Sequence, residues 1–149
     1  YVDIYAIGHN ENIAQNFKQK MLNIGKIVNC PSAYYEQSLI TLASNSDHVA
    51  IILSYSGAYW SSQLCEQLRK KQVPVILVTR AGVKDEACDN VYHLFISDHE
   101  NLQNRISQFS SHIAMQYIMD VLYGAIYNLN RTKNNHYIRK SMSYHDPNQ

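Results

Sequence analysis

The chain has 149 residues, a formal net charge of +1, and only 17% charged residues. This length predicts a single domain with a substantial core, and the low net charge gives no electrostatic footprint for nucleic acid. No stretch approaches the roughly 18 consecutive apolar residues of a membrane span, and no signal-peptide pattern is present, which favours a cytoplasmic location.

Apolar runs alternate with helical periodicities along the chain. The predicted strands cover 2–7, 26–29, 48–53, 74–79 and 91–96. Helical spacing is found at 13–24, 35–42, 61–68 and 102–125, and a short segment at 85–88 precedes the fifth strand. This order predicts an α/β fold: a three-layer sandwich with a five-stranded parallel sheet flanked by helices, in a Rossmann-like arrangement. The polar tail at 130–149 has no clear periodicity and is expected to be a partly frayed extension of a domain at 1–129.

The third predicted strand leads directly into a loop rich in hydroxyl groups. The continuous apolar run from Val49 to Leu53 is typical of a parallel strand covered on both faces, and such sheets bind ligands at the carboxyl ends of their strands. Ser54 and Ser56 offer hydroxyl donors, and Gly57 lets backbone N–H groups form a concave nest at the start of the next helix. The loop therefore predicts a phosphate site, the alternative being ordinary turn chemistry.

Cysteine and histidine spacing does not indicate a metal or cofactor. Cys30, Cys65 and Cys88 are widely separated and form neither a disulfide framework nor a CxxC motif. The histidines lack an i, i+4 pair or a cysteine at ligand spacing. No metal site and no cofactor are predicted.

The chain resembles the sugar isomerase (SIS) domain, a sugar-phosphate-binding module, over nearly its whole length. The most specific segments are 22–26 (LNIGK), 52–57 (ILSYSG) and 111–123 (SHIAMQYIMDVLY). The last segment is similar to the final helix of SIS domains in RpiR-type transcriptional regulators, in which a helix-turn-helix domain comes first. Because the chain begins with Tyr1, we expect such a DNA-binding domain in a preceding segment. The resemblance implies a phosphorylated sugar as the effector.

Two loops depart from the family pattern. The family usually has Gly-x-Gly-x-Ser after the first strand, where this chain has Gly8-His9-Asn10, and a threonine where Tyr59 stands. Tyr59 removes one small hydroxyl and would cover part of the pocket, whereas the Asn10 amide can still donate hydrogen bonds. The ligand-binding residues that the resemblance implies are Gly8, His9, Asn10, Ser54, Ser56, Gly57, Tyr59 and Glu100.

Two of the charged candidates have a second interpretation. Glu100 resembles the acidic residue that SIS domains place near the sugar hydroxyls, but a carboxylate there would also stabilise the amino-terminal end of the following helix. Arg80, after the fourth strand, would reach an anionic ligand or be an exposed loop residue.

Three functions are left open: a sensor, an aldose–ketose isomerase, and a dimerisation module with a degenerate pocket. Isomerisation needs a base and a ring-opening group, and only Glu100, His9 and Glu11 are available. Their poor match to the enzyme pattern favours a non-catalytic sensor.

The last predicted helix carries apolar residues on more than one face, Met119 among them. An uncovered apolar stripe usually marks a subunit interface, so the sequence predicts a homodimer or a tetramer.

Overall fold

The computed structural model describes residues 1–83, 89–100 and 109–144. Five strands form one sheet: β1 (Val2–Ala6), β2 (Val28–Asn29), β3 (Val49–Leu53), β4 (Val75–Arg80) and β5 (Val91–Ile96). Their order is β2-β1-β3-β4-β5, and every neighbouring pair is parallel. This is the doubly wound order of flavodoxin-like folds.

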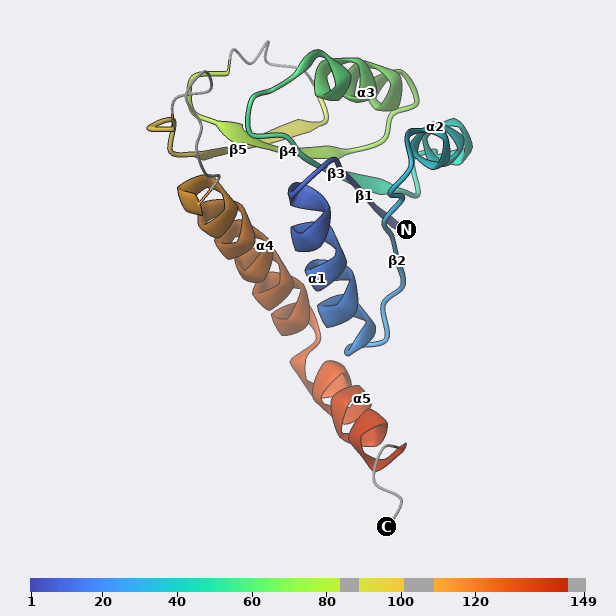
Figure 1. The fold of residues 1–149 in the computed structure, drawn as a ribbon. Helices are drawn as coiled ribbons and strands as arrows, with labels where there is room; N and C mark the ends of the chain where they lie inside the picture. The colour runs from blue at the N-terminus through green and yellow to red at the C-terminus, as the bar shows by residue number, and fades with distance from the viewer. Residues whose placement is uncertain (84–88, 101–108, 145–149) are drawn as a thin grey trace.

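Helices cover both faces of the sheet. They are α1 (Asn10–Leu22), α2 (Tyr34–Ala43), α3 (Tyr59–Lys70), α4 (Phe109–Leu129) and α5 (Arg131–Tyr144). Figure 1 shows α1 and α4 on one face, α2 and α3 on the other, and α5 continuing beyond the end of α4. The predicted α/β sandwich with a five-stranded parallel sheet is confirmed. Within the described ranges, no helix is both long and apolar enough to cross a membrane.

The alternation of side chains along the strands builds two hydrophobic cores. In β1, Ile4 and Ala6 pack with α1 and α4, while Tyr5 points to the other face and packs with α3. In β3, Leu53 joins the first core and Ile52 the second. Since all five side chains are at most 2% exposed, the central strands are covered on both sides, as their continuous apolar runs predict.

The turn that ends α1 is fixed by Gly25. This residue has a φ of +72°, in the left-handed region that favours glycine, and the amide of Lys26 donates to the Met21 carbonyl at 3.0 Å. A Cβ on Gly25 would lie 2.8 Å from the ring of Tyr137 in α5. The turn is therefore packed closely against the last helix.

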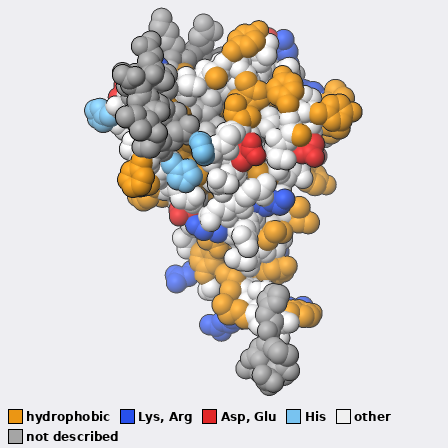
Figure 2. Space-filling model, viewed as in Figure 1, with side chains coloured by type: hydrophobic (Ala, Val, Ile, Leu, Met, Phe, Trp, Pro, Cys, Tyr) orange, Lys and Arg blue, Asp and Glu red, His pale blue; other side chains and the backbone are white. Residues whose placement is uncertain are grey.

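The tail is the main correction to the secondary structure expected from the sequence. Arg131 to Tyr144 form a helix and not a frayed extension. Asn134 is buried, and its Nδ2 donates to the Tyr127 carbonyl at 2.8 Å, so that a polar residue anchors α5 to the end of α4. The helix escapes detection because few of its residues are apolar. Charged side chains of both signs are scattered over the face seen in Figure 2, with Lys and Arg toward the narrow end that α5 forms.

A second correction concerns α4. Met115 and Met119 are fully buried against the first core, so Met119 does not belong to an exposed interface. The exposed stripe of α4 instead consists of Phe109, Ile113, Tyr117 and Val121. The segments expected at 85–88 and 102–108 lie outside the described residues.

Candidate ligand-binding site at the carboxyl edge of the sheet

The strand order creates a topological switch point between β1 and β3. From β1 the chain crosses to β2 on one side, and from β3 it crosses to β4 on the other. In open α/β sheets, ligands bind in the crevice at the carboxyl ends of such a strand pair. The loops after β1 and β3 are therefore the ones expected to contact a ligand.

The structure brings these two loops together. Asn10, the first residue of α1, donates through Nδ2 to the carbonyl of Leu53, the last residue of β3, at 3.2 Å. Gly8 and Gly57 both have a φ of +62°, which a residue with a side chain rarely adopts. Each loop turns sharply away from its strand, and both expose their backbone at the same edge of the sheet.

The loop after β3, residues 54–57, is called the serine loop from here on. It is ordered by backbone hydrogen bonds. Ser54 donates its amide to Val78 of β4 at 3.0 Å, and Gly57 donates to the Ser54 carbonyl at 3.2 Å. Ser54 is buried and Ser56 is exposed, and within the described ranges neither hydroxyl has a hydrogen-bond partner. Both hydroxyls are available to donate to an anion.

Helix amino termini add positive potential to this edge. The N-cap residues that precede α1 and α3, His9 and Ala58, make no side-chain cap hydrogen bond. The first N–H groups of a helix have no partner within the helix, and the helix dipole favours negative charge beside them. Two helix ends therefore reinforce the hydroxyl groups of the serine loop.

Glu100 lies close to the serine loop but already has partners. Its carboxylate accepts from Ser110 Oγ at 2.6 Å and from the Ser111 amide and Oγ at 2.6 and 2.9 Å. Its backbone N–H and carbonyl both contact the hydroxyl of the buried Tyr55, at 3.3 and 3.4 Å. Glu100 thus stabilises the start of α4, one of the two roles that the sequence leaves open, and its contact with the sugar hydroxyls stays a prediction.

Arg80 is half-buried and not the exposed loop residue that was its alternative interpretation. Its amide donates to the Tyr55 carbonyl at 3.0 Å, so it adjoins the serine loop. Its Nε is buried without a hydrogen-bond partner among the described residues, and one terminal guanidinium nitrogen lies 2.8 Å from the position a Cβ on Gly82 would take. A basic residue at the carboxyl end of a buried strand is the sequence signal that points to it.

The remaining candidates are exposed or have other partners. Tyr59 is 76% exposed, and its hydroxyl accepts from Gln63 one turn farther along α3, so its ring does not cover the serine loop. Glu11 accepts from the Gly8 amide at 3.1 Å and holds the turn into α1. His9 is exposed beside it. In the part of the chain that the structure describes, no three His, Cys, Asp or Glu side chains are placed to hold a metal ion.

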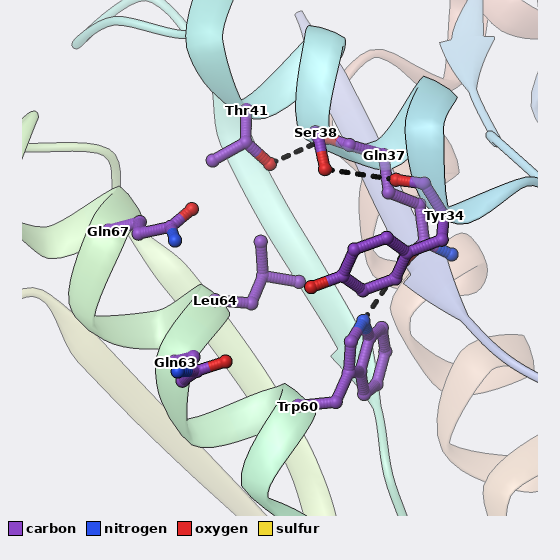
Figure 3. Close-up of a pocket in the computed structure, with 8 residues that line it drawn as sticks. All are labelled: Tyr34, Gln37, Ser38, Thr41, Trp60, Gln63, Leu64 and Gln67. Carbon is purple, nitrogen blue, oxygen red and sulfur yellow. Dashed lines mark hydrogen bonds between the residues drawn. The ribbon is translucent and has the colours of Figure 1, made fainter.

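A separate hollow between α2 and α3 is too small for a sugar. Figure 3 shows Tyr34 and Gln37 of α2 facing Trp60 of α3, with the Trp60 indole N–H donating to Gln37 Oε1 at 3.1 Å. The volume is about 40 Å³, room for a few water molecules. Gln37 also donates to the Ala6 carbonyl at 3.0 Å. These residues hold α2 and α3 against the sheet.

Comparisons with known proteins bear on the same domain. The sequence model of the SIS domain matches residues 1–119. The fold is similar to the sugar isomerase domain of an RpiR transcription factor from Sphaerobacter thermophilus, with a TM-score of 0.73 and 11% identity over 95% of this chain and 78% of that one. It is also similar to the Vibrio vulnificus NanR protein complexed with ManNAc-6P, with a TM-score of 0.79 and 13% identity over 100% of this chain.

This chain spans 57% of the NanR chain, little more than half its length. A third similar structure is that of a Listeria monocytogenes protein named as a sugar-phosphate isomerase, with a TM-score of 0.70 and 14% identity over 91% of this chain and 72% of that one. At these identities the three structures establish the fold.

Proposed function

Because this chain belongs to the SIS-domain family, we propose that it is the sugar-phosphate-sensing and dimerising domain of an RpiR-type transcriptional regulator, without catalytic activity. The observation that carries the proposal is the meeting of the loops after β1 and β3 at the switch point, joined by the Asn10–Leu53 hydrogen bond. Ser54, Ser56, Gly57 and the amino end of α3 would hold the phosphate. The NanR complex with ManNAc-6P supports a phosphorylated sugar as the ligand class.

The roles of the other site residues follow from their positions. Gly8 and Asn10 would shape the side of the crevice at the amino end of α1. Arg80 would add a positive charge from the end of β4. His9 and Tyr59, which are both exposed, would contact the sugar and not the phosphate. DNA would be read by a domain outside this chain, and the protein would act in the cytoplasm.

The hydrogen bonding of the acidic residues supports the absence of catalysis. An isomerase needs a base that moves a proton between adjacent carbons of the substrate. The Glu100 carboxylate accepts three hydrogen bonds from the start of α4, and the Glu11 carboxylate accepts one from Gly8. Carboxylates held in this way are poorly placed to exchange a proton with a sugar.

The competing function is that of a sugar-phosphate isomerase. It is favoured by the similar fold of the Listeria monocytogenes protein that is named as such an enzyme. Incubation with hexose and pentose phosphates in deuterated water distinguishes the two functions. We expect no exchange of carbon-bound hydrogen. Exchange that disappears in Glu100→Gln would establish the enzyme and contradict the sensor.

Binding is tested by thermal unfolding with a panel of phosphorylated sugars. A ligand that binds only the folded state raises the melting temperature with its concentration. We expect a shift that is lost in Ser54→Ala/Ser56→Ala and kept in Ser46→Ala/Ser62→Ala, a matched pair of exposed serines. No shift with any sugar phosphate would favour a dimerisation module with a degenerate pocket.

Dimerisation is assigned to the exposed stripe of α4. Phe109, Ile113, Tyr117 and Val121 recur every four residues, so they lie along one side of the helix, and each is more than half exposed. We expect light scattering to give a dimer or tetramer that Ile113→Asp/Tyr117→Asp converts to a folded monomer. An unchanged mass in this variant would remove α4 as the interface.

A further inference from the structure

A second hollow lies at the other end of α1 from the serine loop. Its volume is about 410 Å³, and it is bordered by the turn after α1, the end of α4 and the middle of α5. Small-molecule sites typically have volumes of about 300–1,000 Å³. Because α1 has 13 residues, this hollow is separated from the carboxyl edge of the sheet by about 20 Å.

Basic side chains converge on this hollow. Lys26, Lys133, His136 and Lys140 line it, and no Asp or Glu does. Within the described ranges none of these residues forms an ion pair, and α5 contains no acidic residue. In Figure 2 blue side chains adjoin orange ones toward the narrow end of the molecule, where α5 lies. Like charges gathered without a counter-charge repel one another, and a bound anion would relieve that repulsion.

The rest of the lining is largely apolar. Ile24, Ile126, Leu129 and Tyr137 contribute to it, and the Tyr137 ring is held against the backbone of Gly25. Leu129 is 85% exposed and offers apolar surface at the rim. An extended polyanion would not use such walls, whereas an organic anion with an apolar body would bury its body and pair its charge.

We propose that this hollow binds a small organic anion with an apolar body, of which a medium-chain carboxylate is the simplest form. The alkyl chain of the ligand would pack between Ile24, Ile126 and Tyr137. Its carboxylate would pair with Lys133 and Lys140. The site is separate from the sugar-phosphate site, because the length of α1 lies between them and most of the lining, at 126–140, lies beyond residues 1–119 that match the SIS family.

The test is calorimetric titration of the full chain with octanoate, octanol and inorganic phosphate. Octanoate is expected to bind. Octanol and phosphate are expected to bind at least about tenfold more weakly, because octanol lacks the negative charge and phosphate lacks the alkyl chain. Lys133→Ala/Lys140→Ala should weaken octanoate by at least about tenfold. Lys18→Ala/Arg139→Ala removes the same charge from outside the hollow and should leave octanoate binding nearly unchanged. Ser54→Ala/Ser56→Ala should also leave it unchanged.

Four outcomes would overturn the proposal. Equal weakening by the two charge-removing pairs would mean that bulk charge attracts octanoate. Octanol binding as tightly as octanoate would mean that the lysines play no part, and phosphate binding as tightly would mean that the apolar walls play none. The absence of octanoate binding at millimolar concentration would exclude the site. Circular dichroism of each variant shows that loss of binding does not come from unfolding.

Discussion

Polar side chains at the two edges of the sheet differ in their hydrogen bonding. At the amino edge, the fully buried Asp3 carboxylate accepts from Asn29 Nδ2 at 2.6 Å and from Ser44 Oγ at 3.3 Å, and lies 2.7 Å from His48 Nδ1. At the carboxyl edge, the hydroxyls of Ser54 and Ser56 and the Nε of Arg80 have no hydrogen-bond partner among the described residues.

This difference separates stability from binding. A buried polar group costs free energy unless it is hydrogen-bonded, so the paired groups of the amino edge stabilise the fold. Groups without partners add nothing to the stability of the fold, and where they are buried they lower it, but they can bind a ligand without first breaking other contacts. Substitutions of the paired side chains at the amino edge should therefore change stability, and those of the unpaired side chains at the carboxyl edge should change affinity.

The largest effect is expected for Asp3→Ala. This substitution leaves three buried or half-buried polar groups without their shared partner, and we expect a loss of about 3 kcal/mol in the free energy of unfolding by urea. Asp47→Ala, at an exposed position nearby, should change it by less than about 0.5 kcal/mol. A loss below about 1 kcal/mol for Asp3→Ala, or a weakened affinity for sugar phosphate, would break the proposed division between the edges.

Gly57→Ala tests the shape of the serine loop, with Gly8→Ala as its matched control. Both residues have a φ of +62°, but an added Cβ at Gly57 would lie 2.6 Å from Val83, whereas one at Gly8 meets no atom within 4 Å. We expect a loss of about 1 kcal/mol for Gly8→Ala, from backbone strain, and about 2 kcal/mol for Gly57→Ala. Equal losses in urea unfolding would mean that the Val83 contact contributes nothing.

Arg80→Gln should affect affinity and leave stability almost unchanged. Hydrogen bonds from a charged donor to phosphate are strong, so we expect affinity for the best sugar phosphate to fall about tenfold, or about 1.4 kcal/mol. Arg69→Gln, at an exposed position in α3, should have no effect. Titration calorimetry measures both. Unfolding that becomes easier by more than about 1 kcal/mol would place Arg80 among the structural residues.

The smallest effect is expected for Tyr5→Phe, on the free energy of unfolding at alkaline pH. Burial raises the pKa of Tyr5 above its ordinary value of 10.0; hydrogen bonds with Thr41 and Ser44 lower it, and the charge of Asp3 raises it. The folded state therefore keeps this proton at a pH where the unfolded state loses it. The corresponding stability is present below pH 10 and is lost as the pH rises toward the folded-state pKa. Tyr5→Phe should flatten the decline above pH 10, and identical slopes would contradict this.

Most of the fold could be predicted because its strands are buried on both faces. Such strands are continuous apolar runs, and the helices between them show regular spacing, so the parallel sheet and its flanking helices follow from the sequence. The sequence does not predict helix α5, because this helix is held by a polar residue, Asn134, and not by an apolar stripe. Periodicity likewise cannot say which apolar face of α4 is buried, so the prediction that Met119 belongs to an interface is wrong.

The candidate site was partly predictable because its loops follow strands in chain order. The position after a buried strand points to the loop after β3, the family resemblance adds the loop after β1, and the structure joins the two through Asn10. Contacts between distant residues could not be predicted in the same way. The network of Asp3 joins residues up to 45 positions apart, and the orientation of Tyr59 and the half-buried position of Arg80 depend on packing that no local pattern encodes.

The most direct test of the central claim is backbone amide NMR of the full chain titrated with the sugar phosphate that raises the melting temperature most. The account predicts that the largest chemical-shift changes fall on Gly8, Asn10, Ser56, Gly57 and Arg80, at the carboxyl edge, while Asp3, Asn29 and His48 at the amino edge stay unperturbed. Changes centred on the hollow beside α5, or on the small hollow between α2 and α3, with none in the loops after β1 and β3, would contradict it.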